Sequence, residues 1–254
     1  MKLLTLARDL QRRKARERQH CFVAEGVRAV ESLLDSPLDI VGLLAAESLS
    51  DDPRGVAALK RAGTLGLSVH SVSDDEFASA AGTEAPQGLL AIAHIPAREL
   101  TAPPDVARYL VLDALQDPGN VGTVIRTAAA LGVTATLALE GTVDLWNAKV
   151  VRSAMGALFS HPVIACSWES VATHFDHFGV ACCVADVDGD DVQSMPHLAS
   201  ARRLALVVGN EGAGLSANVA ERAAFRLTIR MAAGVESLNV AVATGILLHA
   251  LRPI

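Results

Sequence analysis

The feature that most constrains the fold is a series of six short apolar runs in the second half of the chain, separated by stretches of helical character. The runs are YLVLDA (109–114), TATLALE (134–140), HPVIAC (161–166), GVACCVADV (179–187), RLALVVG (203–209) and FRLTIR (225–230). They lack the alternation typical of a strand with one solvated face, so each is expected to be buried on both faces. Such strands alternating with helices predict an α/β fold, a parallel sheet covered by helices on both sides.

The first half of the chain predicts a smaller α/β domain. Helices are expected over 22–34 (FVAEGVRAVESLL) and 53–63 (PRGVAALKRAG), and strands over 40–46 (IVGLLAA), 67–72 (LSVHSV) and 88–95 (GLLAIAHI). The stretch HIPARELTAPPD that follows contains three prolines and no periodicity, which is typical of a linker. We therefore expect two domains, over residues 1–98 and 104–254.

The charge is unevenly distributed, although the net charge is only −6. Residues 1–28 contain eight basic and three acidic residues, a net charge of +5, which leaves −11 on the remainder. The acidic balance argues against a protein that coats nucleic acid through bulk electrostatics. The basic stretch KLLTLARDLQRRKARERQ lacks the apolar core and cleavage site of a targeting peptide, so we expect a solvated helix face there.

Several common site types are not indicated. The cysteines at 21, 166, 182 and 183 show neither metal nor disulfide spacing, which favours a reduced, cytoplasmic protein. No apolar run approaches the ~20 residues of a membrane helix. His174 and His177 have helical spacing for a metal pair but no third ligand near them, and DVDGDDVQSMPH lacks the glycine and glutamate of a calcium loop. We expect no membrane contact and no metal.

Three polar loops follow predicted strands of the second half, at the edge where parallel sheets bind ligands. In the first, LQDPGNVGTVIRTAAALG, Pro118 and Gly119 predict a turn and Asn120 can cap the following helix. The apolar face of that helix directs Arg126 away from the sheet. Taken alone, Asn120 is a plain cap and Arg126 a solvated arginine.

The second and third loops add further polar side chains. In LVVGNEGAGLS, three glycines within six residues allow the backbone to approach a ligand, but their spacing is not the dinucleotide-binding fingerprint. Glu211 among them is either functional or an ordinary surface residue. In the third loop, Glu236, Ser237 and Asn239 precede an apolar helix that we expect to be buried nearly all round. Ser237 or Asn239 alone can be a helix cap.

Together the loops resemble the three motifs of the SpoU/TrmH class of RNA ribose methyltransferases. The matching segments, in order, are DPGNVGTVIRTAAALG, KVVRSAMGALFSHPV, GNEGAGLS and IRMAAGVESLNVAVATGILL, and they cover the whole second half. FVAEGVRAVESLL and PQGLLAIAHIP resemble the start and end of the ribosomal-protein-like RNA-binding domain that often precedes this catalytic domain. One departure is Arg230, where the family usually has proline.

The resemblance implies a fold and a cofactor. The C-terminal segment would be threaded through a loop to make a trefoil knot, a rare exception to unknotted chains. The enzyme would be a homodimer with its active site at the dimer interface, using S-adenosylmethionine held at Val208, Gly209, Ile229 and Leu238. The functional polar residues would be Asn120, Arg126, Glu211, Ser237 and Asn239.

The implied reaction is methylation of a ribose 2′-hydroxyl in structured RNA. Because a guanidinium is a poor proton acceptor, we expect Arg126 to hold a phosphate or stabilise the developing alkoxide. Glu211 and Asn120 would shape the site, while Ser237 and Asn239 would fix cofactor and ribose.

The two-domain layout favours ribosomal RNA, 23S ribosomal RNA in particular, over transfer RNA. The alternatives are a transfer RNA 2′-O-methyltransferase, a non-catalytic RNA-binding protein and a nucleotide-dependent enzyme of another type. The presence of all five polar residues favours an enzyme, and the lack of a phosphate-cradling loop disfavours the last alternative.

Overall fold

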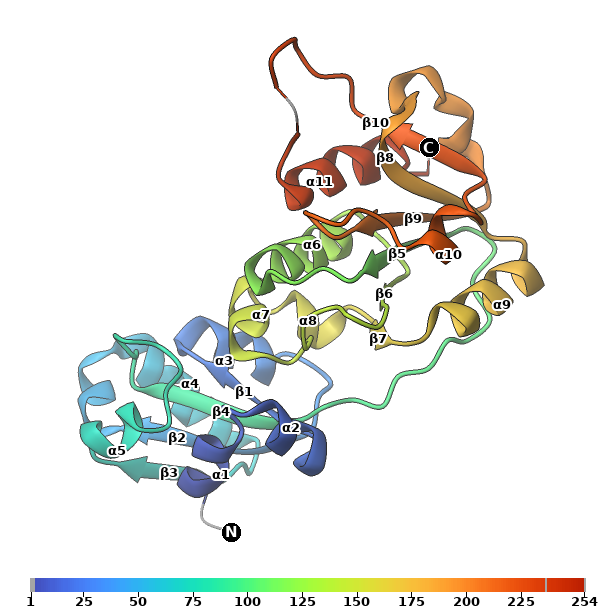
Figure 1. Cartoon of the computed structure of the whole chain (residues 1–254). Coiled ribbons are helices and arrows are strands. Elements are labelled where there is room, and N and C mark those ends of the chain that lie inside the picture. Colours follow the sequence, from blue (N-terminus) through green and yellow to red (C-terminus); the bar gives the residue numbers. More distant parts are fainter. Residues whose placement is uncertain (1–2, 236, 254) are drawn as a thin grey trace. The chain divides into compact units, whose positions relative to one another are not determined.

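The chain divides into two compact units (Figure 1). The computed structural model describes residues 3–235 and 237–253. The first unit runs to Ala97 and also takes in Asp144–Ser160, and the second comprises Arg98–Val143 and the chain from His161 onward. We expected residues 144–160 in the second domain, whereas they pack against the first strand of the first unit.

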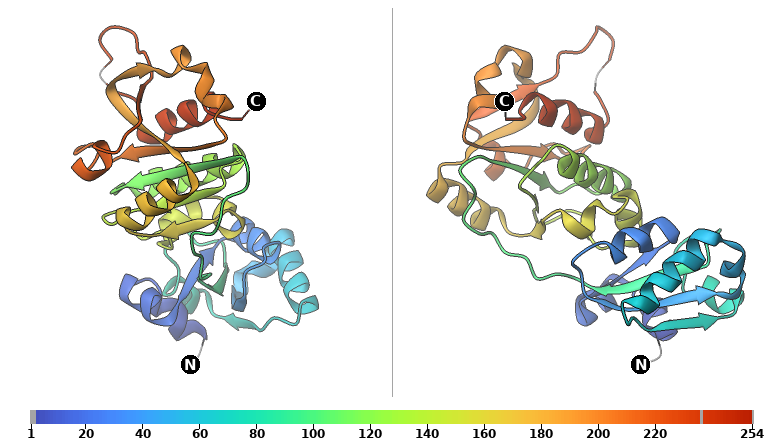
Figure 2. Two further views of the ribbon diagram at one scale, coloured as in Figure 1. Left: turned by 90° about the vertical axis from the view of Figure 1, so that its right-hand side faces the viewer. Right: turned by 180° about the vertical axis from the view of Figure 1, so that it is seen from behind.

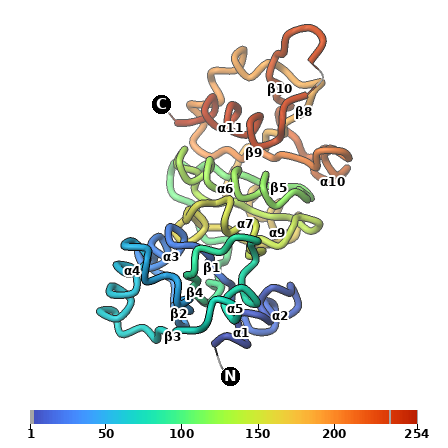
Figure 3. Tube along the Cα trace, turned by 90° about the vertical axis from the view of Figure 1, so that its left-hand side faces the viewer, coloured from blue at the N-terminus to red at the C-terminus, as the bar shows by residue number. Residues whose placement is uncertain are grey.

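The first unit is built on a four-stranded sheet with strand order β1-β4-β2-β3. The strands are β1 (Cys21–Glu25), β2 (Ile40–Ala46), β3 (Val69–Val72) and β4 (Leu89–His94). The helices are α1 (Leu3–Asp9), α2 (Arg13–Gln19), α3 (Val27–Leu34), α4 (Pro53–Thr64), α5 (Asp74–Ala78), α7 (Ala148–Ser153) and α8 (Ala157–Ser160), with a 3-10 helix η1 (Glu47–Asp51). Strand β4 is antiparallel to β1 and β2, and β3 is parallel to β2. Helices α3 and α4 lie side by side (Figure 3).

The helix expected over 22–34 is wrong in its first part, where residues 21–25 form β1. The first four residues of this strand are buried and pair with β4, so tertiary packing overrides the helical periodicity. Gly26 then adopts a φ of 100°, a left-handed conformation that favours glycine, and α3 begins at Val27. The strands expected near 40–46, 67–72 and 88–95 and the helix at 53–63 are confirmed.

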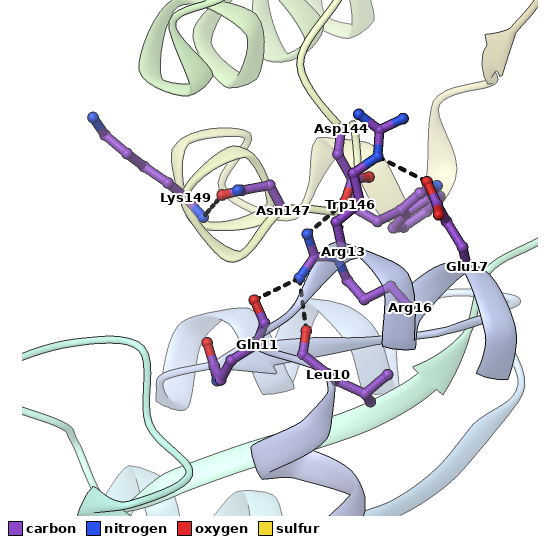
Figure 4. A network of polar contacts seen from close by, with 9 residues as sticks. All are labelled: Leu10, Gln11, Arg13, Arg16, Glu17, Asp144, Trp146, Asn147 and Lys149. Carbon is purple, nitrogen blue, oxygen red and sulfur yellow. Dashed lines mark hydrogen bonds and ion pairs between the residues drawn. The ribbon is translucent and has the colours of Figure 1, made fainter.

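The segment from Asp144 is fixed to the first unit by a buried ion pair (Figure 4) and by aromatic packing. Nε and Nη2 of Arg16 donate to Oδ2 of Asp144 at 2.8 and 2.6 Å. The Trp146 ring lies 4.5 Å, centroid to centroid, from Phe22 on β1. The expectation of a solvated basic face is therefore wrong at Arg16, which is 5% exposed.

The second unit contains a six-stranded sheet with strand order β10-β8-β9-β5-β6-β7. Its strands are β5 (Ala107–Asp113), β6 (Ala135–Ala138), β7 (Val163–Ala165), β8 (Ala181–Asp191), β9 (Arg203–Gly209) and β10 (Phe225–Thr228). Its helices are α6 (Pro118–Ala130), α9 (Trp168–Phe178), α10 (Ala217–Ala220) and α11 (Val240–Ala250), with the 3-10 helices η2 (Val192–Ser194) and η3 (Pro196–Ser200). Every neighbouring pair is parallel, which confirms the α/β sheet expected from the six apolar runs.

Helices cover both faces of this sheet (Figure 2). On one face, Val171 and Phe175 of α9 share a core cluster with Tyr109, Val111 and Val207. On the other, α6 packs against α11, and α11 contacts β9. The buried side of α6 is the apolar face expected from its sequence.

The last helix departs from the expectation that it is buried nearly all round. Residues such as Thr244 and Leu248 are buried, but Val242 and Ile246 are 52% and 42% exposed. These two residues, one turn apart, form an apolar stripe on the outer side of α11. The end of α11 is tied to the sheet by Arg108, a buried residue whose Nε donates to the Leu251 carbonyl at 2.8 Å.

Candidate active site

The first two loops begin side by side because β5 and β9 are neighbours in register. Asp113 pairs with Gly209 across the two strands. Oδ2 of Asp113 accepts hydrogen bonds from the Ser216 backbone nitrogen and hydroxyl at 2.7 and 2.8 Å, and Nδ2 of Asn210 donates to the Ala114 carbonyl at 2.8 Å. Asp113 and Asn210 thus hold the two loops together. Neither residue was expected at the site from the sequence. The signal that could have indicated them is a polar residue at the end of a buried strand.

A chain of side-chain hydrogen bonds joins all three loops. Nδ2 of Asn120 donates to Oε1 of Glu211 at 2.9 Å, and Nδ2 of Asn239 donates to Oδ1 of Asn120 at 3.0 Å. Oδ1 of Asn239 in turn accepts from the Ala241 backbone nitrogen at 2.9 Å, which caps α11. Three residues far apart in sequence are therefore brought together in one polar cluster.

The structure corrects the expected cap of α6. The N-cap is Asp117, whose Oδ1 accepts from the Asn120 backbone nitrogen at 2.7 Å. Asn120 lies in the first turn of the helix, and its side chain is thereby left to bond Glu211 and Asn239. Gly132 follows the helix with a φ of 73°, as expected for a glycine that ends it.

A cavity of about 750 Å³ lies beside this cluster. Its lining includes the four residues expected at the cofactor, Val208, Gly209, Ile229 and Leu238, and also Glu211, Ser237 and Asn239. A Cβ on Gly209 would stand 2.5 Å from the Gly214 carbonyl oxygen, so only glycine lets the loop fold back this closely. The loop is closed by reciprocal backbone hydrogen bonds of 2.9 Å between Asn210 and Gly214.

The remaining expected residues differ in position. Arg126 is exposed on α6 and does not line the cavity. Ser237 lines it, and its hydroxyl forms no hydrogen bond within the described part of the chain. Arg230 is a solvent-exposed residue with Nε 3.7 Å from Oδ2 of Asp191. Glu236 lies outside the described residues.

The histidine pair belongs to an aromatic cluster. Nε2 of His174 is 3.3 Å from the Tyr109 hydroxyl, and burial lowers the pKa of His174. Among the described residues, 3–235 and 237–253, no group of three histidine, cysteine or acidic side chains could hold a metal ion. No helix in that same part of the chain is both long and apolar enough to span a bilayer.

Two family models match this chain. The SpoU rRNA Methylase family matches residues 107–249, and the MRM3-like substrate binding domain matches residues 5–91. The first match covers more than half of the chain and contains all three polar loops.

Relatives and solved structures match over nearly the full length. The chain is 36% identical over 246 residues to the 23S rRNA (guanosine(2553)-2′-O)-methyltransferase RlmP of Bacillus subtilis, covering 96% of this chain and 94% of the relative. The crystal structure of AdoMet-bound rRNA methyltransferase from Sinorhizobium meliloti superposes with a TM-score of 0.87 at 28% identity, covering 99% of this chain and 94% of that one. A putative TrmH-family RNA methyltransferase of Porphyromonas gingivalis gives a TM-score of 0.81 at 31% identity, covering 98% of this chain and 96% of that one.

Proposed function

The chain belongs to the SpoU rRNA methylase family, and from this membership we propose that it transfers a methyl group from S-adenosylmethionine to a ribose 2′-hydroxyl of ribosomal RNA. The observation that carries the proposal is the hydrogen-bonded chain of Asn120, Glu211 and Asn239, of which Glu211 and Asn239 line the cavity. A structural role alone would not require a carboxylate and two amides from three separate loops to meet beside an open cavity.

The cavity suits S-adenosylmethionine. Its volume of about 750 Å³ lies within the roughly 300–1,000 Å³ of small-ligand pockets. Apolar side chains such as Ile229 and Leu238 line it together with the glycine loop, whose backbone can approach a ligand closely. We propose that Val208, Gly209, Ile229 and Leu238 hold the cofactor.

S-adenosylmethionine, when bound, supplies a methyl group already activated by its sulfonium, so the protein has chiefly to position the ribose. Glu211 fixes the Asn120 amide, and Asn120 in turn fixes Asn239, so the three side chains are preorganised. The hydroxyl of Ser237, which lines the cavity, can hydrogen-bond cofactor or ribose. The planar guanidinium of Arg126 would bind an RNA phosphate or the developing alkoxide.

We further propose a homodimer and a knotted C-terminal segment. Val242 and Ile246 form an exposed apolar stripe on α11, and such a stripe suits an interface with a second copy. The active site would then lie at that interface. The threading of the last segment is supported by the likeness to the family and by the ties of α11 to β9 and Arg108.

For the substrate, we propose 23S ribosomal RNA, bound through the first unit, in preference to transfer RNA. The Bacillus subtilis relative is named as a 23S rRNA methyltransferase. The match of residues 5–91 to a substrate binding domain supports RNA binding by the first unit. The four cysteines are free thiols, which supports a reduced, cytoplasmic location.

Purified protein tests the proposal directly. It should bind S-adenosylmethionine but not NAD by calorimetry, and should transfer a labelled methyl group to 23S rRNA transcripts. Asn120→Ala should slow transfer on the order of 100-fold through lost positioning while keeping cofactor affinity. The matched control is Asn218→Ala, on an exposed position of α10. The proposal would be contradicted if the protein bound NAD but not S-adenosylmethionine, or if Asn120→Ala and Asn218→Ala transferred the methyl group at equal rates.

A further inference from the structure

The first unit contains a second cavity, of about 680 Å³, which has no part in the site described above. It lies among the first turns of α3, the start of α4, the loop over 83–87 and α7. Its volume is within the roughly 300–1,000 Å³ range of ligand pockets. Five of the twelve lining residues are charged, namely Arg28, Arg54 and Arg152 with Glu25 and Glu31.

Both glutamates of this cavity are already engaged. Oε2 of Glu25 accepts from the Gly82 backbone nitrogen at 2.7 Å, and Oε1 accepts from the Thr83 hydroxyl, so this carboxylate organises the loop. Glu31 accepts two hydrogen bonds from Arg54, at 2.5 and 3.3 Å. Arg54 and Glu31 therefore neutralise each other, whereas Glu25 keeps its formal negative charge because its partners are neutral. Three arginines against two glutamates leave the lining with a formal charge of +1.

Two arginines remain uncompensated. The guanidinium groups of Arg28, on α3, and Arg152, on α7, form no hydrogen bond or ion pair with any residue from 3–235 or 237–253. Two guanidinium groups that line one cavity without carboxylate partners favour an anion, and their planar fork matches the oxygens of a phosphate.

The rest of the lining suits a base rather than a bare phosphate. Oε1 of Gln87 accepts from the Val27 backbone nitrogen at 3.1 Å, whereas its Nε2 donates to no group in the described part of the chain. This amide is available for a carbonyl or ring nitrogen of a ligand. Met155 is 55% exposed at the cavity and offers an apolar surface, and unpaired bases stack on apolar and guanidinium planes.

From these features we infer that the cavity binds one unpaired nucleotide of the RNA substrate, with its phosphate on Arg28 and Arg152 and its base between Met155 and Gln87. The inference rests on the proposed function and adds to it a recognition site separate from the site of methyl transfer. A paired helix does not enter a cavity of this size, whereas an unstacked base does. The substrate is thus an RNA that carries an unpaired nucleotide in addition to the methylated ribose.

The test compares Arg28→Ala and Arg152→Ala with Arg61→Ala, a matched loss of one charge on α4. Arg61 pairs with Asp35 and lies outside the cavity. The probes are a 23S rRNA transcript, and a hairpin with an unpaired loop beside a fully paired duplex of equal length. Each cavity variant should raise Kd for the transcript and the hairpin about ten-fold and lower the slope of log K against log salt by about 1, whereas Arg61→Ala should change Kd less than about two-fold.

Further measurements separate the outcomes. An unchanged urea midpoint of Trp146 fluorescence, measured in a Trp168→Phe background, shows that the first unit of each variant is folded. Arg28→Lys, which keeps the charge but loses the fork, should give an intermediate Kd. Kd values equal to those of Arg61→Ala, or an equal loss of affinity for hairpin and duplex, would overturn the inference. If the wild-type protein transfers no methyl group to 23S rRNA, the proposed function is contradicted. If both cavity variants methylate 23S rRNA with an unchanged KM, only the nucleotide site is contradicted.

Discussion

Removing the Asp144 carboxylate should destabilise the first unit far more than removing a surface charge. The side chains of Arg16 and Asp144 are 6% and 17% exposed, and Arg16 Nη1 also donates to the Leu10 and Gln11 carbonyls at 2.7 and 3.0 Å. Asp144→Ala leaves a buried guanidinium without its counter-charge, which typically costs about 3–5 kcal/mol. We expect about 3 kcal/mol, because the partly exposed side of the pair lets water reach Arg16.

The assay is urea unfolding followed by the fluorescence of Trp146, which packs on Phe22, in a Trp168→Phe background so that the signal reports the first unit. Glu17→Ala is the control, because it breaks an exposed pair with Arg13 on the same helix and should barely move the midpoint (Figure 4). Combining Asp144→Ala with Arg16→Met should cost less than the sum of the single changes by about 1 kcal/mol or more. A loss for Asp144→Ala as small as that for Glu17→Ala would show that the Arg16–Asp144 pair does not stabilise the first unit.

Three further predictions follow from burial and close packing. Gly209→Ala should weaken S-adenosylmethionine binding by about ten-fold or more, because the added Cβ has no room against the loop. Gly63→Ala, whose Cβ would meet nothing within 4 Å, should leave the affinity unchanged, and equal affinities of the two variants in calorimetry would contradict the prediction. Burial lowers the pKa of His161 to about 4, so the unfolded chain, with an ordinary histidine pKa near 6.5, takes up the proton first as pH falls. Stability is therefore lost from about pH 6.5 down to about pH 4, by about 2 kcal/mol at pH 5, and His161→Gln should remove that loss in urea titrations at pH 8 and pH 5. Burial raises the pKa of Cys182 to about 11 and that of Cys183 to about 12. A thiol reagent at pH 8 should therefore label both cysteines at least about ten-fold more slowly in the native than in the unfolded protein, and equal labelling rates would show that the thiols are accessible.

The sheet of the second unit was predictable because both faces of each strand are buried. A parallel strand covered by helices on both sides leaves an apolar run without alternation, and RLALVVG coincides with β9. Strand β1 was not predictable from periodicity, since its apolar residues also fit the helix that follows. What decides is pairing with β4, a partner about 70 residues away.

Three of the residues expected at the site lie together in the structure, but the bonds between them were not predictable. The motifs that resemble the SpoU/TrmH class indicated Asn120, Glu211 and Asn239, and the family assignment is confirmed. That Asp117 caps α6 and leaves Asn120 to join the other two depends on backbone positions that no spacing encodes. The burial of Arg16 likewise depends on Asp144, 128 positions away in the chain.

Mapping 2′-O-methyl groups in ribosomal RNA shows whether this protein methylates a ribose there. The map should be made for cells that carry the protein, cells that lack it, and cells that carry only the Asn120→Ala or the Arg126→Ala variant. We predict a ribose of 23S rRNA that is methylated only with the intact protein, and the guanosine named for the Bacillus subtilis relative is the first position to inspect. Identical maps in all four strains would show that this protein does not methylate ribosomal RNA.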